Sequence, residues 1–134
     1  MSVSSFTQNL TAYFAQFWCA ETSYTPEFWS FENPAYEECV PTCLIIQDML
    51  GGKIERGTVQ LIDGSTDSHY WNSIKDVAVD VTLCQYGQQY QKTIIKPVPA
   101  GFSDLRAFLL SNPDTRTRYE LLKKRLKAPF PHFS

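Results

Sequence analysis

The sequence predicts an α+β fold, with one domain spanning residues 1–134. Three observations favour this class. Apolar residues recur at helical spacing near the N-terminus, β-forming residues separated by turn residues fill the middle, and helix caps occur in the last third. Runs of helix, then strand, then helix are typical of α+β domains. We therefore expect N-terminal helices packed on an antiparallel sheet, with further helices at the C-terminus.

The first predicted helix spans residues 5–18. It has an apolar stripe and an N-cap at Ser4 or Ser5, and the stripe consists of Phe6, Leu10, Tyr13, Phe14 and Phe17. Residues 21–36 follow neither the helical nor the strand period, because Pro26 and Pro34 flank three aromatic residues. This segment is predicted to be an ordered loop held by aromatic side chains.

A second, largely apolar helix is predicted over residues 40–50, with Pro41 in its first turn and Gly51-Gly52 at its end. Consecutive antiparallel strands are then expected. Their predicted ranges are 53–62, 69–73 and 77–83, with a turn at Asp63-Gly64 and one further strand at 93–98.

Two helices are expected to close the chain. The first spans residues 103–110. The second has Asn112 as its N-cap, Pro113 at its first position, and lysine and arginine residues in its last turn, where the helix dipole favours cations.

Composition excludes several classes of protein. The 134 residues carry a net charge of −2, with 43% hydrophobic and 19% charged residues, so a disordered protein is excluded. A chain of this size buries roughly 68% of its unfolded surface, enough for a core. No apolar run approaches the roughly 20 residues of a membrane span. Near-neutral charge argues against a nucleic-acid partner, and the polar start, without a secretory signal, predicts a cytoplasmic protein.

Four cysteines are predicted to be free thiols, and no cofactor or metal is expected. Cys19, Cys39, Cys43 and Cys84 form no C-x-x-C pair, and the chain has only two histidines, which does not fit standard zinc spacing. Cys39 stands immediately before the second helix, where backbone N–H groups and the helix dipole favour a thiolate. Cys39 is therefore the candidate nucleophile, although a cysteine at such a position is often a small buried residue.

His69 and Asp80 are the candidate partners of Cys39. A hairpin with a four-residue loop at 73–76 pairs Asn72 with Val77 and places His69 opposite Asp80, on the same face of the sheet. A carboxylate beside an imidazole fixes its tautomer and stabilises the imidazolium. The order Cys, His, Asp thus predicts a catalytic triad, although a one-residue slip in register would separate the last two.

Other candidate roles each have a structural alternative. Asn33 is the candidate donor to an oxyanion, or else the start of the turn at Pro34. Trp29 and Trp71 could form the walls of a substrate groove, or belong to an aromatic core. A metal site of oxygen and nitrogen ligands could be drawn from Asp63, Asp67, His69 and Asp80.

Several stretches together resemble the YunG-like family of small bacterial proteins, over residues 18–126. Among them are Glu32-Asn33-Pro34-Ala35-Tyr36 followed by Cys39, Ser68-His69-Tyr70-Trp71-Asn72, and Leu110-Ser111-Asn112-Pro113-Asp114-Thr115-Arg116. That family is similar to the papain-like cysteine hydrolases, a group with NlpC-type peptidases and transglutaminases. The papain motif Cys-Gly-Ser/Ala-Cys-Trp/Tyr is absent.

The resemblance implies a papain-like fold with Cys39 as nucleophile, His69 as base and Asp80 as the residue that orients it. The expected activity is that of a cysteine-dependent amidase, peptidase or acyl-transfer enzyme acting on a small molecule or a peptide. The alternative is a non-catalytic binding or regulatory module with a protein partner. A fold by itself does not distinguish them.

Overall fold

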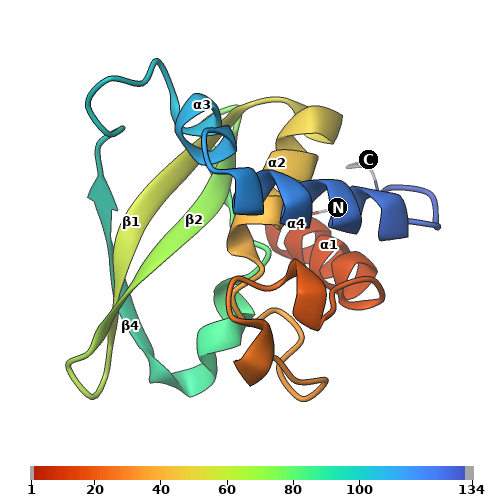
Figure 1. The fold of residues 1–134 in the computed structure, drawn as a ribbon. Coiled ribbons are helices and arrows are strands. Elements are labelled where there is room, and N and C mark those ends of the chain that lie inside the picture. The colour runs from red at the N-terminus through yellow and green to blue at the C-terminus, as the bar shows by residue number, and fades with distance from the viewer. Residues whose placement is uncertain (1, 132–134) are drawn as a thin grey trace.

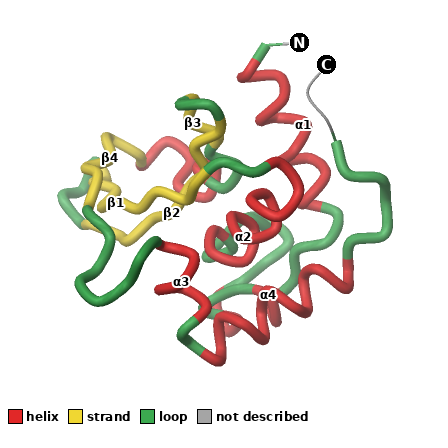
Figure 2. The backbone as a smooth tube through the Cα atoms, turned by 90° about the horizontal axis from the view of Figure 1, so that it is seen from above, coloured by secondary structure: helices red, strands yellow, loops and turns green. Residues whose placement is uncertain are grey.

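The structure, a computed structural model, describes residues 2–131 and has an α+β architecture (Figure 1). A four-stranded antiparallel sheet is combined with helices from both ends of the described chain. In Figure 2, α1, α2 and α4 lie on one side of the strands. The elements are α1 Val3–Ala15, α2 Cys39–Leu50, β1 Lys53–Leu61, β2 Thr66–Ile74, β3 Val77–Val79, β4 Tyr90–Lys96, α3 Leu105–Leu110 and α4 Pro113–Arg125.

Helix α1 begins earlier than predicted, with Ser2 rather than Ser4 or Ser5 as its N-cap. The Ser2 hydroxyl accepts a hydrogen bond from the backbone N–H of Ser5 at 3.1 Å, which satisfies one free donor of the first turn. The helix ends at Ala15 rather than at residue 18, so Phe17 lies beyond it, and the other four residues of the predicted stripe are confirmed. Phe6, Leu10, Tyr13 and Phe14 are all buried.

The loop after α1 contains two short 3₁₀ turns, Ala20–Thr22 and Pro26–Phe28. Trp29 holds this loop in place as predicted, because its indole Nε1–H donates to the backbone C=O of Pro34 at 2.9 Å. Its ring also packs edge-on against Phe31, with centroids 4.8 Å apart.

Helix α2 begins at Cys39, so this cysteine is the first residue of the helix rather than the residue before it. The helix is buried along most of its length, and it ends where predicted, at Gly51 with a φ of 77°. Its Leu44 and Ile46 are fully buried in one apolar core with Leu10, Phe14 and Leu122.

The strands are ordered β3-β2-β1-β4. Strand β4 therefore pairs with β1 and not with the strand that precedes it in the sequence. Strand β3 is shorter than the predicted 77–83, because the chain leaves the sheet after Val79 and forms a 3₁₀ segment, η3, at Leu83–Gln89.

The predicted register of the second hairpin is wrong. The turn has Lys75 and Asp76 at its tip, with φ values of 52° and 64°, and Asn72 faces Val79 instead of Val77. Both turn residues have positive φ, as in the tight turns that match strand twist. Because the displacement is an even number of residues, each side chain stays on the face predicted for it.

The two faces of the sheet have different neighbours. On the face toward the helices, Ile54 and Val79 belong to the apolar core, and Asn72 Nδ2 donates to the C=O of Cys43 in α2 at 3.0 Å. On the outer face, the His69 and Trp71 rings stack with centroids 6.0 Å apart. We call these the helix-facing and outer faces.

The C-terminal helices are capped by side chains. Helix α3 begins after Asp104, whose carboxylate accepts from the Ala107 N–H at 2.8 Å, slightly later than the predicted start at 103. Asn112 caps α4 as predicted, with Pro113 at its first position and basic residues in its last turn. No helix within residues 2–131 has the length and apolarity needed to cross a membrane.

Candidate functional site

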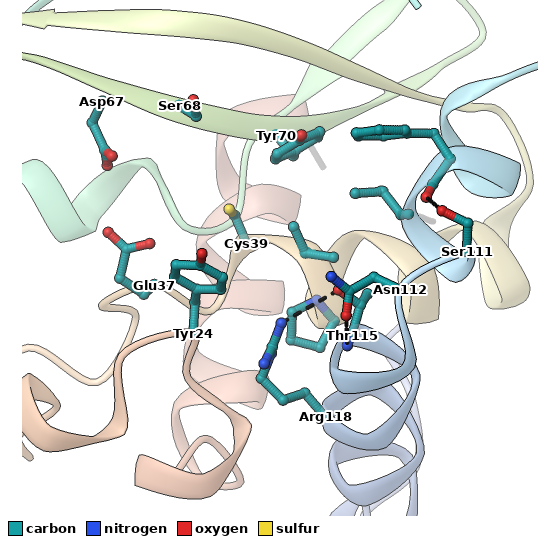
Figure 3. A pocket seen from close by; sticks show the side chains of 14 residues that line it. Tyr24, Glu37, Cys39, Asp67, Ser68, Tyr70, Ser111, Asn112, Thr115 and Arg118 are labelled. Atoms are coloured by element: carbon teal, nitrogen blue, oxygen red, sulfur yellow. Dashed lines mark hydrogen bonds between the residues drawn. The ribbon is translucent and has the colours of Figure 1, made fainter. Parts of the chain in front are cut away.

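A pocket of about 490 Å³ opens at the N-terminal end of α2 (Figure 3). Its volume falls within the roughly 300–1,000 Å³ typical of small-molecule sites. The loop before α2, the start of β2, and helices α3 and α4 all contribute to its wall. The polar residues among those that line it are Tyr24, Glu37, Cys39, Asp67, Ser68, Tyr70, Ser111, Asn112, Thr115 and Arg118.

The thiol of Cys39 lies at the edge of β2. Strand β3 pairs with β2 only at residues 72–74, so the outer edge of β2 before Asn72 has no neighbouring strand. The backbone N–H of Tyr70 donates to the Cys39 sulfur there. Cys39 is 7% exposed and lines the pocket. The beginning of α2 is thus anchored to an unpaired edge of the sheet, with its thiol at the pocket wall.

The environment of Cys39 favours the thiol over the expected thiolate. The pKa of Cys39 is raised to about 12, chiefly by burial and also by the negative charges of Glu37, Asp80 and Asp67, against the lowering effect of the Tyr70 N–H. The prediction from the helix dipole is therefore wrong for the resting protein. Desolvation and three nearby carboxylates outweigh the helix start.

His69 and Asp80 are in direct contact. His69 Nε2 lies 2.9 and 2.8 Å from the two carboxylate oxygens of Asp80. The imidazole is fully buried, whereas the Asp80 side chain is 19% exposed. Because Nε2–H donates to the carboxylate, Nδ1 keeps its lone pair, and the Tyr86 hydroxyl lies 3.5 Å from it. The sequence predicted this pairing, although from a different register.

Cys39 and His69 are not hydrogen-bonded to one another within residues 2–131. Among residues 2–131, the hydrogen bonds of the His69 ring go only to Asp80 and Tyr86. His69 points to the outer face of β2 and does not line the pocket. The charge of Asp80 nevertheless reaches Cys39 and raises its pKa. The thiol and the His69–Asp80 pair therefore lie on two sides of one strand edge.

The structure does not bring the other predicted site residues to the pocket. The Asn33 amide Nδ2 donates to the Gln85 backbone C=O at 2.9 Å. Trp29 belongs to the loop described above, and Trp71 stacks on His69. None of these three lines the pocket. Its aromatic wall comes instead from Tyr24, Tyr70 and Phe108.

Two carboxylates line the pocket, of which the sequence predicted Asp67 only as a ligand of the alternative metal site and did not predict Glu37. The pKa of Glu37 is raised to about 7, chiefly by burial and also by the charge of Asp67, against the lowering effect of His69. Asp67 accepts a hydrogen bond from the Tyr86 hydroxyl at 2.8 Å. Sequence position holds a clue to both, since Glu37 is two residues before Cys39 and Asp67 is two residues before His69.

The next carboxyl group, that of Glu38, is buried behind the pocket. One of its oxygens accepts from the Thr22 hydroxyl at 3.0 Å, and the other has no partner among the described residues. Burial raises the pKa of Glu38 to about 9, so the group is a neutral acid at pH 7. The side chains of Glu37 and Glu38 therefore lie in different environments, since Glu37 lines the pocket and Glu38 is fully buried.

The alternative metal site does not assemble. Asp63 stays in its turn, where its carboxylate accepts from the N–H and hydroxyl of Ser65 at 2.9 and 2.6 Å. Within the described part of the chain, no three histidine, cysteine or acidic side chains are grouped so as to hold a metal ion.

Fold and site together define an α+β protein with a buried thiol at a helix start, a histidine–aspartate pair beside it and an open pocket in front. Comparison with protein families gives a finer assignment. Residues 7–130 match a family described as "YunG protein", so the chain belongs to the YunG family. Neither a curated protein nor a solved structure matches the chain.

Proposed function

We propose that the protein is a cysteine-dependent acyl-transfer enzyme of papain-like type, an amidase or peptidase. Cys39 is the nucleophile, His69 the base and Asp80 the residue that positions the base. The contact between His69 and Asp80, at 2.8 Å beside the strand edge that holds Cys39, is the observation that supports the proposal most directly. A buried imidazole with a carboxylate on one nitrogen is suited to accept a thiol proton on the other, where the neighbouring Tyr86 hydroxyl donates its proton to Asp67.

The resting thiol implies general-base catalysis. Because the pKa of Cys39 is raised to about 12, the sulfur is protonated at pH 7. As its S–C bond to the substrate carbonyl forms, the proton passes to His69 Nδ1. That proton then leaves with the departing amine, which yields a thioester. Water attacks the thioester, again with His69 as base, and releases the acid and the thiol.

The backbone of β2 links the thiol to the proposed base. Cys39 is bound to the backbone of Tyr70, the residue after His69 in β2, so thiol and imidazole flank the same peptide unit. Catalytic hydrogen bonds often form only when substrate is bound. A substrate that fills the pocket and displaces the Tyr70 contact would free the sulfur to approach Nδ1.

Covalent labelling tests the proposal. The probes are peptidyl chloromethyl ketones, in which an alkylating group is joined to a peptide that can bind in the pocket. Iodoacetamide, which has no such peptide, is the undirected reference. We expect the ketones to alkylate Cys39, detected by intact mass and peptide mapping. The rate should fall about a hundredfold or more in Asp80→Asn and in His69→Gln, as general-base assistance is lost.

Cys84 provides the matched control within the same molecule, because it is exposed and does not line the pocket. Its labelling rate should be unchanged in His69→Gln, and in Asp80→Asn it should rise, because the charge of Asp80 contributes to the raised pKa of Cys84. Asp80→Asn keeps the shape of the side chain, so circular dichroism should show an intact fold. Labelling of Cys39 that is unchanged in both variants would contradict the proposed triad.

A non-catalytic binding module is the second candidate. It is favoured by the complete burial of His69 and by the absence of a hydrogen bond from its ring to Cys39 among the described residues. In that case His69 and Asp80 stabilise the outer face of the sheet. Ligand binding without any covalent Cys39 adduct, together with a lower melting temperature in Asp80→Asn, would establish this function instead.

A further inference from the structure

The pocket has unpaired charges of opposite sign on its two sides. Figure 3 shows Glu37 and Asp67 on one side of Cys39, and Asn112 and Arg118 on the other. From this arrangement we propose that the pocket binds a short peptide with both termini free, its ammonium group between Glu37 and Asp67 and its carboxylate at Arg118. The proposal rests on the proposed function and names the substrate class of the same site.

The acidic side lacks a cation. Among residues 2–131, neither Glu37 nor Asp67 takes part in an ion pair. The two carboxylates repel one another, which contributes to the raised pKa of Glu37. The Tyr86 hydroxyl occupies one oxygen of Asp67. An ammonium group supplies three donors and a positive charge, so it would relieve the repulsion and fill the remaining acceptor positions.

The backbone holds Glu37 firmly in position. Its φ of 55° is unusual for a residue other than glycine. Its N–H donates to the side-chain oxygen of Gln85 at 3.0 Å, and its C=O accepts from Tyr24 at 3.0 Å. These bonds fix the acidic side of the pocket before a ligand arrives.

The basic side comes from α4. The Arg118 guanidinium lies over the Tyr24 ring, 5.2 Å from its centroid, and one nitrogen donates to the Thr115 hydroxyl at 3.3 Å. Within the described residues Arg118 has no carboxylate partner. Asn112 uses its oxygen to cap α4, which leaves its amide N–H groups available. A guanidinium with free donors is well suited to bind a carboxylate.

The thiol lies between these charges. Cys39 is 7% exposed and accepts from the Tyr70 N–H, but its own S–H donates no hydrogen bond within residues 2–131. A peptide held at both ends would place a carbonyl group near this thiol. The pocket volume of about 490 Å³ has room for a few residues only, which agrees with a short peptide.

Binding of three matched peptides tests the proposal. Trialanine, N-acetyl-trialanine and trialanine amide differ only in their terminal charges. We use Cys39→Ser protein, so that the peptide is not cleaved during the measurement, and we measure its affinity by calorimetry. Trialanine should bind, and each cap should weaken binding about tenfold to a hundredfold, the usual effect of losing a hydrogen bond to a charged group.

Variants assign each charge to its side of the pocket. In Glu37→Gln, N-acetylation of the peptide should lower its affinity much less than it does in the parent. In Arg118→Gln, amidation of the C-terminus should likewise lower the affinity much less. Glu27→Gln and Lys124→Gln, at exposed positions away from the pocket, are the controls and should behave as the parent. Carboxyl NMR of Glu37 should show its pKa falling when trialanine binds. Melting temperatures confirm that each variant is folded.

The outcomes separate this proposal from the proposed function. No binding of trialanine, or caps with no effect, would overturn the peptide assignment even if Cys39 labelling still depends on His69. Charge-dependent binding without any covalent adduct on Cys39 would support the peptide assignment and contradict the enzyme. Binding by Mg²⁺ or Ca²⁺ alone that abolishes peptide binding would also overturn it, in favour of a cation site.

Discussion

The two faces of the sheet are buried by different kinds of contact. On the helix-facing face, Ile54 and Val79 join an apolar core that also includes α1, α2 and α4. On the outer face, Trp71 and Val59 are buried outside that core, beside a histidine that is bound to a carboxylate. The first face is held by apolar contacts with many elements. The second is held by a few polar and aromatic contacts, among them those of His69 with Asp80 and Tyr86.

Side chains alternate between the two faces along β2, and this alternation decides which of them reach the pocket. Tyr70 points toward the helices and the pocket, while its neighbours His69 and Trp71 point outward. Cys39 is bound to the backbone between them. A thiol at the strand edge can therefore face a pocket on one side and an imidazole on the other.

The largest expected effect is loss of the helix-facing core. Leu44→Ala removes a fully buried side chain from α2 and should lower the free energy of unfolding by about 2–5 kcal/mol. Val59→Ala, at a fully buried position on the outer face, should cost less, because fewer methyl groups are removed from a smaller cluster. Urea denaturation measures both. An equal or larger loss for Val59→Ala would contradict the contrast between the faces.

The second effect concerns Glu38 and depends on pH. Its pKa of about 9 in the folded protein exceeds its ordinary value of 4.5, so the native state holds a proton that the unfolded state releases between these values. The unfolding free energy should therefore fall as pH rises through this window, by up to about 1.4 kcal/mol per pH unit.

Glu38→Gln removes this titration and should flatten the pH profile, with its greatest gain over the parent at high pH. Urea melts from pH 5 to 9 measure the slope, and Glu27→Gln, at an exposed position, serves as the control. Parallel profiles for Glu38→Gln and the parent would show that the carboxyl is not buried as described.

A third effect tests the packing of the outer face. An added Cβ at Gly57 would lie 2.6 Å from the Ile94 backbone oxygen and 3.0 Å from Trp71. Gly57→Ala should therefore destabilise the protein by about 1–3 kcal/mol and change the fluorescence of Trp71. Thr58→Ala, on the other face of the same strand, is the control. Equal stability of the two variants would contradict the close approach.

The smallest expected effect lies in the turn between β2 and β3. Asp76 has a φ of 64°, a conformation that glycine adopts without strain. Asp76→Gly should leave the register unchanged and raise the unfolding free energy by up to about 1 kcal/mol, because relief of the roughly 1–2 kcal/mol cost of the left-handed conformation outweighs the added freedom of the unfolded chain. Gly64→Ala, at a φ of 90°, should have the opposite sign. Urea melts of both variants check the pair.

Local chemistry made part of the fold predictable. The N-cap at Asn112 with Pro113 after it, and the end of α2 at Gly51, follow from backbone preferences of single residues. The register of the second hairpin was not predictable in this way. Its turn uses Lys75 and Asp76 instead of asparagine and glycine, so the usual sequence pattern for a tight hairpin is missing.

The candidate site was predictable only where its partners lie close in the sequence. The contact between His69 and Asp80 follows from one hairpin, and it survived an error in register because the faces were preserved. Arg118 has no local signature, since it reaches the pocket only through the packing of α4. The raised pKa of Cys39 depends on burial and on distant carboxylates, which no sequence spacing reveals.

The composition of the pocket wall has a consequence for the newly made chain. Cys39 and the edge of β2 are synthesised well before α4, which supplies Arg118. Until Arg118 has left the ribosome, the thiol borders a hollow that lacks the wall formed by α4 and has no basic side chain. Synthesis of α4 therefore completes the lining of the pocket in the nascent chain.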